Sequence, residues 1–155
     1  MKKVKYAITV GIILILTSLP VSFGESPQIN KAEAGNVINR SAAIIRTSQR
    51  FAADGQKYDG LGLTLGHQLW AVKLYQQGGY QNAAFHSLRA RGLAARVISL
   101  NKSSIINEAL YDRNEERLIR SSPSGSELDR RLKEAKVGIL SDQAAANADM
   151  DLEVN

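Results

Sequence analysis

Cysteine is absent from the 155 residues of this chain, and histidine occurs only twice. The first absence excludes disulfide bonds, thiol catalysis and metal ions held by cysteine. The second leaves few residues for a nucleophile–base pair, so no catalytic residue is predicted. No segment alternates apolar and polar residues over a useful length, and no β-strand is expected. Stability must therefore come from side chains buried between helices.

The first residues have the layout of a secretory signal peptide. Three lysines within the first five positions precede a run without charge that ends at Gly24. Pro20 interrupts this run, and Ser22 with Gly24 supplies small residues for cleavage. Its apolar core is shorter than the roughly 20 residues of a membrane-spanning helix, which favours cleavage over anchoring. Residues 1–24 are predicted to be removed (an alternative cut follows Ala34) from a protein exported to the periplasm or the extracellular space.

Charge is distributed unevenly along the rest of the chain. Residues 36–107 hold nine basic and two acidic side chains, whereas residues 108–155 hold seven basic and eleven acidic ones. The simpler interpretation is that an acidic C-terminal part docks on a basic bundle. The alternative is a basic surface for an anionic phospholipid, polysaccharide or nucleic acid.

Apolar residues recur at helical spacing along most of the chain, which predicts an all-α fold. The expected arrangement is one antiparallel bundle of four helices with a short fifth helix. The four helices are predicted at residues 36–54, 63–77, 80–100 and 105–120. Gly78 and Gly79 are expected to fold the second helix back onto the third as an α-hairpin.

Composition sets the remaining boundaries. Residues 25–35 are expected to be flexible, and the bundle to span residues 36–120. The serine-rich residues 121–126 form a predicted linker, and the short fifth helix follows at residues 127–138. Residues 139–155 are acidic, rich in alanine and poor in large apolar side chains, which predicts a disordered tail.

The second predicted helix is apolar on two sides. One of these sides carries Leu63, Trp70 and Leu74. A helix of this kind is usually covered on both sides, so it lies centrally or lends one face to a partner. Leu63, Trp70 and Leu74 are therefore a candidate face for another protein or for a second copy of the chain.

Part of the predicted hairpin, over residues 71–93, resembles a tetratricopeptide (TPR) unit. The small, large, turn and aromatic places of that pattern are taken by Ala71, Leu74, Gly78, Tyr80, Ala83 and Ala90. His67 stands at the place where the family has tryptophan, and no second copy follows at the period of about 34 residues. The resemblance implies one TPR-like hairpin inside a bundle, and protein binding as a role.

Arg91 falls in the middle of the buried stripe of the third helix. A buried guanidinium without a partner costs several kcal/mol, so it must pair with a carboxylate, stack on a ring or open into a cleft. The candidate carboxylates are Asp54, Glu108, Asp112, Glu115 and Glu116. A structural ion pair is the first interpretation, and an anion-binding residue in a groove between helices is the second.

Arg89 and Arg96 lie on the outer face of the same helix with Phe85 nearby. Together with Arg91 they are the candidate ligand-binding residues, as a basic and aromatic patch for anionic polymers; a solvated helix face is the plainer interpretation. His67 and His86 are expected about one helical turn apart, at the surface or its boundary. No metal ion or other cofactor is predicted.

These features favour an exported, non-enzymatic helical protein that serves as a structural or protein-interaction module. Its expected partners are proteins, with a homo-oligomer through the second helix as one form of partner. An anionic ligand, polymer or lipid surface bound by the basic half is the alternative, without recognition of a specific nucleic acid. A metal-binding or enzymatic bundle is the second alternative.

Overall fold

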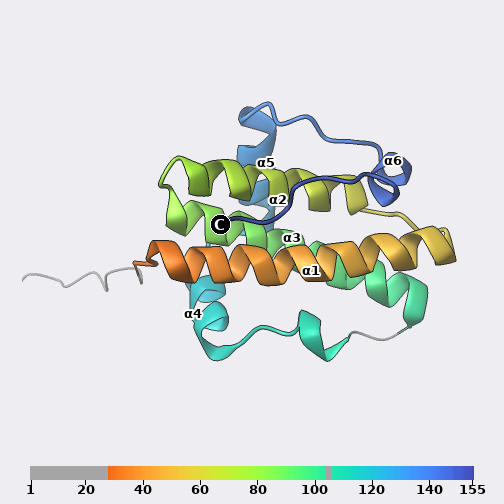
Figure 1. The fold of residues 1–155 in the computed structure, drawn as a ribbon, viewed down its shortest axis with the longest axis horizontal. Helices are drawn as coiled ribbons and strands as arrows, with labels where there is room; N and C mark the ends of the chain where they lie inside the picture. Colours follow the sequence, from red (N-terminus) through yellow and green to blue (C-terminus); the bar gives the residue numbers. More distant parts are fainter. Residues whose placement is uncertain (1–27, 104–105) are drawn as a thin grey trace, which may run out of the picture.

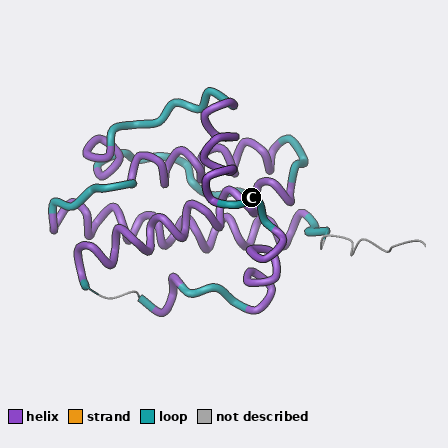
Figure 2. Tube along the Cα trace, turned by 180° about the vertical axis from the view of Figure 1, so that it is seen from behind, coloured by secondary structure: helices purple, strands orange, loops and turns teal. Residues whose placement is uncertain are grey.

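A computed structural model describes residues 28–103 and 106–155 of the protein. These residues form helices and loops without any strand, which confirms the predicted all-α fold (Figures 1 and 2). The helices in chain order are α1 (Lys31–Gly55), α2 (Leu61–Gln76), α3 (Tyr80–Lys102), the 3-10 turn η1 (Asn107–Ala109), α4 (Arg113–Ser121), α5 (Gly125–Glu134) and α6 (Asp142–Ala146). The predicted signal peptide, residues 1–24, lies outside the described part. Of the helices that are described, none is long and apolar enough to cross a membrane.

The three long helices α1, α2 and α3 make the centre of the molecule, and α2 runs opposite to both of the others (Figure 1). Ile38, Ile45, Leu65 and Ile98 are among their fully buried side chains. Each such side chain contributes roughly 1.5–3 kcal/mol when removed from water. The turn between α2 and α3 uses Gly78 at a φ of +81°, a conformation that favours glycine, as the predicted hairpin requires. The likeness of this hairpin to a TPR unit stays a prediction.

The first helix begins earlier than the sequence predicted. Asn30 accepts a hydrogen bond from the backbone N–H of Glu33, and the Glu33 carboxylate accepts one from the backbone N–H of Asn30. This reciprocal cap satisfies donors at the helix start. The expectation of flexibility over residues 25–35 was therefore wrong from residue 31 onward, where Ala34 is fully buried.

The fourth predicted helix is shorter than expected. Its predicted start, Ser104 and Ile105, lies outside the described residues, and only the turn η1 and an extended stretch precede Asp112. Asp112 accepts hydrogen bonds from the backbone N–H groups of Asn114 and Glu115, so α4 begins directly after it. The predicted linker is also shorter, because α5 already starts at Gly125.

The C-terminal residues are docked, and the prediction of a disordered tail over residues 139–155 was wrong. The helix α6 packs beside α2, and residues 147–155 run as an extended strap across α1 and α2 (Figure 1). Leu152 is buried in the core. Gln68 donates a hydrogen bond to the Leu152 carbonyl oxygen, and Gln49 donates to those of Ala145 and Ala148. The strap is held in place by hydrogen bonds from amide side chains on α1 and α2, which are distant in sequence. For this reason its own composition did not indicate that it is ordered.

We predict that Gly62→Ala destabilises the protein by about 1–3 kcal/mol through overpacking. A β-carbon at position 62 would lie 2.1 Å from the carbonyl oxygen of Leu140, so the segment before α6 would have to move. At Gly138 an added β-carbon meets no atom within 4 Å, and Gly138→Ala should stay within about 0.5 kcal/mol of the wild type. Urea denaturation measures both changes, and equal stability of the two variants would contradict the docked C-terminal part.

Candidate functional site

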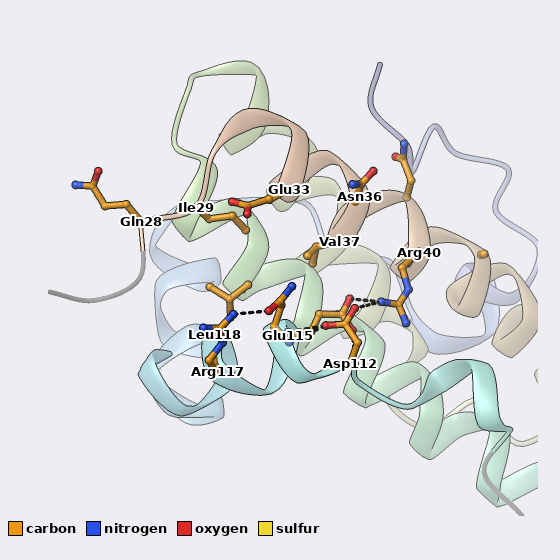
Figure 3. Close-up of a pocket in the computed structure, with 13 residues that line it drawn as sticks. Gln28, Ile29, Glu33, Asn36, Val37, Arg40, Asp112, Glu115, Arg117 and Leu118 are labelled. Carbon is orange, nitrogen blue, oxygen red and sulfur yellow. Dashed lines mark hydrogen bonds and ion pairs between the residues drawn. The ribbon is translucent and has the colours of Figure 1, made fainter. Parts of the chain in front are cut away.

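A groove opens between the N-terminal half of α1 and the helix α4 (Figure 3). Its volume is about 760 Å³. The wall formed by α1 and the residues before it consists of Gln28, Ile29, Glu33, Asn36, Val37, Asn39, Arg40 and Ala43; the wall formed by α4 and its cap consists of Asp112, Asn114, Glu115, Arg117 and Leu118. The groove therefore combines apolar side chains, amides and charges of both signs.

The inner side of the groove ends on a buried ion pair between α3 and α4. Arg91 is fully buried, and its Nη1 and Nη2 donate to Oε2 and Oε1 of Glu115, each over 2.8 Å. The guanidinium also donates from Nε to Ser41 and from Nη2 to the Val37 carbonyl oxygen, both on α1. The prediction that Arg91 points inward and pairs with a carboxylate is confirmed, with Glu115 as the partner.

The Glu115 carboxylate binds other groups besides Arg91. Its Oε2 accepts the backbone N–H of Asp112 over 3.0 Å, and its Oε1 lies 3.1 Å from Nη1 of Arg40. Arg40 also pairs with Asp112 at the edge of the groove. The backbone N–H of Glu115, together with Arg40, lowers the pKa of Asp112. Two arginines and two carboxylates thus form one neutral network along the groove, of which Figure 3 shows Arg40, Asp112 and Glu115.

The candidate ligand-binding residues do not converge on one surface. The Arg91 guanidinium is paired with the Glu115 carboxylate. Arg89 donates from Nε and Nη2 to the two carboxylate oxygens of Asp129. Phe85, expected on the outer face, is buried against α4 and α5. Arg96 is exposed and pairs with no carboxylate in the described part of the chain. The predicted basic and aromatic patch is thereby reduced to one arginine.

The candidate interaction face on α2 is half-buried. Leu63, Trp70 and Leu74 all keep part of their surface in water. The Lys73 ammonium lies 5.3 Å from the centre of a Trp70 ring and shields it. Contact of this face with another protein stays a prediction.

The two histidines are buried and touch, so their expected place at the surface or its boundary was wrong. His67 on α2 is fully buried and His86 on α3 is 2% exposed. Their Nδ1 atoms lie 2.9 Å apart. The ring centres are 5.1 Å apart, which means that the two Nδ1 atoms point head-on at each other. The sequence-based estimate of one helical turn between them neglected the reach of two imidazole side chains.

A carboxylate from α5 completes this polar chain. Oδ1 of Asp129 lies 2.9 Å from Nε2 of His67, while Arg89 binds the same carboxylate. Since the ionised Asp129 only accepts, His67 must carry its proton on Nε2, and its Nδ1 is a bare acceptor. His86 must then donate from Nδ1, which leaves its Nε2 without a proton.

Burial governs the titration of these groups. Desolvation lowers the pKa of His67 and outweighs the hydrogen bond that His67 donates to Asp129, which raises it. Desolvation, with the neighbouring His67 and Arg131, lowers the pKa of His86 to about 4. Burial would raise the pKa of Asp129, but the hydrogen bonds from Arg89 and His67 outweigh it and lower that pKa. Both imidazoles are therefore neutral at pH 7.

The sequence held one signal for this chain of side chains. His67 lies within the predicted second helix, between the buried Leu65 and the partly buried Leu69, so its helix was predicted although its burial was not. Asp129 gave no signal, because it lies on a separate short helix far along the chain. In the described residues no three metal-donating side chains of histidine, aspartate or glutamate converge.

We predict that Glu115→Ala lowers the free energy of unfolding by about 3–5 kcal/mol, because it leaves a buried guanidinium unpaired. Arg91→Met combined with Glu115→Met should recover most of this loss, since both charges are then gone. As a control, Arg46→Ala removes an exposed pair with Glu153 and should change stability by less than about 1 kcal/mol. Urea denaturation measures all three. A loss for Glu115→Ala no larger than for Arg46→Ala would refute the structural role of the buried pair.

We predict different tautomers for the two imidazoles at about pH 7.5, where both are neutral. His67 should be protonated at Nε2 and His86 at Nδ1, because only this assignment gives every close contact one donor. Long-range proton–nitrogen NMR spectra report the tautomers directly, and the variant His86→Asn assigns the two signals. Two Nε2-protonated rings would leave bare Nδ1 atoms facing each other and would contradict the chain of hydrogen bonds.

Comparison with protein-family models, with curated proteins and with solved structures found no significant match to this chain. The role of the protein is therefore inferred from the chemistry of its own residues. Among these residues, those that line the groove between α1 and α4 combine amides, charges and apolar side chains around one accessible cavity.

Proposed function

We propose that this chain is an exported, non-enzymatic protein-interaction module that binds an extended polypeptide segment in the groove between α1 and α4. The observation that carries the proposal is the groove itself, about 760 Å³ in volume and lined by amides and apolar side chains. Pockets that bind drug-sized ligands are typically about 300–1,000 Å³, so the groove has room for a ligand of that size, such as a few residues of a peptide.

The way the protein holds its own C-terminal strap supports a peptide as the occupant. The Asn39 amide donates to the carbonyl oxygen of Val154 and accepts from the backbone N–H of Val154, both over 2.9 Å. These two hydrogen bonds satisfy the backbone N–H and C=O groups of Val154, as a neighbouring β-strand does for an extended chain. Asn39 also lies at the edge of the groove. One amide on α1 thus already binds an extended chain beside the proposed site.

The groove repeats this chemistry. Gln28 and Asn36 offer further amides that can donate to and accept from a peptide backbone, and Asn114, whose oxygen accepts from Arg117, still has an amide donor. Ile29 and Leu118 provide apolar contacts for side chains that alternate along an extended segment. Glu33 and Arg117, which have opposite charges, favour a segment of mixed charge over a polyanion.

Export and the absence of catalysis complete the proposal. Export rests on the pattern of residues 1–24, which lie outside the described part. The non-enzymatic role is supported by the network of Arg40, Arg91, Asp112 and Glu115, whose charged groups are already paired with one another. Paired groups of this kind fix a surface and do not present a free acid, base or nucleophile.

We predict that the protein selects peptides from a random library of displayed 12-residue sequences, used here as the probe. Selected peptides should shift backbone NMR signals of the residues lining the groove. Ala43→Trp places a bulky ring in the groove at an exposed position of α1, and it should weaken binding at least about tenfold, or about 1.4 kcal/mol.

The matched control is Ala53→Trp, which makes the same change at an exposed alanine of α1 away from the groove. It should leave affinity unchanged. Peptides that bind Ala43→Trp as well as the wild type would place the binding site elsewhere, and a library without binders would overturn the proposal.

A further inference from the structure

A short helix, α5, is attached to the α2–α3 hairpin mainly through one buried polar chain and two leucines. Leu128 and Leu132 are its buried apolar side chains. Asp129 is its polar attachment, bound to His67 on α2 and to Arg89 on α3. The other side chains of α5 are exposed or half-exposed. Elements with few buried contacts are the ones that open locally in native proteins.

We propose that the His67–His86 pair is an acid-operated latch that holds α5 on the α2–α3 hairpin and releases it when the pair takes up protons. The latch is a regulatory device of the fold, and it is independent of what the groove binds.

The Nδ1–Nδ1 contact of the closed latch holds only one proton, and any further proton places charge on buried rings. A proton on Nδ1 of His67 would set two N–H groups against each other across 2.9 Å. A proton on Nε2 of His86, which has no hydrogen-bond partner among the residues described, would create a cation on a side chain only 2% exposed, where the little water that reaches this atom solvates the charge poorly. Either position turns an attractive contact into a repulsive one or buries a charge.

The charged groups around the pair compensate that proton only in part: Asp129 favours it at His67 but is outweighed by burial, and at His86 the effects of His67 and Arg131 exceed that of Asp129. From α3 the pair faces Arg89, and from α5 it faces Asp129 and Arg131; α2 contributes His67 itself. The single carboxylate, Asp129, is already bound by the Arg89 guanidinium through both oxygens. An added positive charge therefore meets two arginines and one neutralised aspartate, and departure of α5 relieves it by admitting water.

The direction of the pH effect follows from the two states. With α5 released, the imidazoles are hydrated and have pKa values near 6.5. In the closed state burial lowers both pKa values, that of His86 to about 4. The released state thus binds protons first as pH falls. Closure is complete above about pH 6.5 and weakens progressively as the pH falls toward 4.

The chain offers an uncluttered test, because these are its only two histidines. Hydrogen exchange is measured on the wild-type protein without peptide at about pH 7.5 and pH 5, corrected for the intrinsic pH dependence of exchange. Opening of α5 should rise about 30-fold if one histidine takes up a proton and up to about 1,000-fold if both do. The middle of α1 should change far less.

Two outcomes would overturn the latch. One is protection of α5 that does not change with pH. The other is equal loss of protection in α1 and α5, which would indicate acid unfolding of the whole bundle. Failure of either kind leaves peptide binding in the groove untouched, since α5 exchange is measured without peptide.

A double variant separates titration from packing. His67→Gln keeps an N–H group for Asp129, and His86→Asn keeps a donor toward position 67, but neither side chain titrates. Protection of α5 from hydrogen exchange in this variant should not depend on pH between about 5 and 7.5. A pH dependence like that of the wild type would contradict the proposal. If the variant does not fold by circular dichroism, NMR titration of the two wild-type imidazoles decides: a folded-state pKa at or above about 6.5 for both would overturn it.

Discussion

The ion pair of Arg91 with Glu115 is the constraint on which the arrangement of the other helices depends. A guanidinium in the middle of the α1–α3 contact is stable only if a carboxylate reaches it. Glu115 does so from α4 and at the same time caps the first turn of that helix through the backbone of Asp112. The ion pair with Arg91 on α3 therefore sets both the position of α4 and the residue at which it starts. The same pairing gives the groove its inner wall.

Charge joins the two halves of the chain throughout the structure. Arg40, Arg46, Arg89 and Arg91 belong to the basic half, and each binds a carboxylate that follows residue 108. Asp142 adds a further link by accepting the backbone N–H groups of Gly60 and Gly62 at the start of α2. Four of the nine basic residues at positions 36–107 thus find carboxylate partners in the C-terminal part of the chain.

The buried charged and polar side chains form two sites, one around Arg91 and one around His67 and His86. At Arg91 a guanidinium and a carboxylate of opposite charge are in direct contact, so the two charges balance each other. At His67 and His86 the neutral state depends on two imidazoles remaining unprotonated. One site fixes α4 firmly, and the other makes the attachment of α5 conditional on pH. A fold with one permanent and one conditional attachment can move one short helix while its three-helix centre stays intact.

The all-helical fold, the glycine turn between the second and third helices, and the inward direction of Arg91 with Glu115 among its candidate partners could all be predicted from the sequence. Each of these follows from local periodicity or from the free energy of one buried group, which neighbours in sequence already specify. Only the tertiary structure decided that His67 meets His86 and Asp129, and that the strap around Leu152 is ordered. Those contacts join residues from separate elements, and their free energy arises from partners that no local pattern contains.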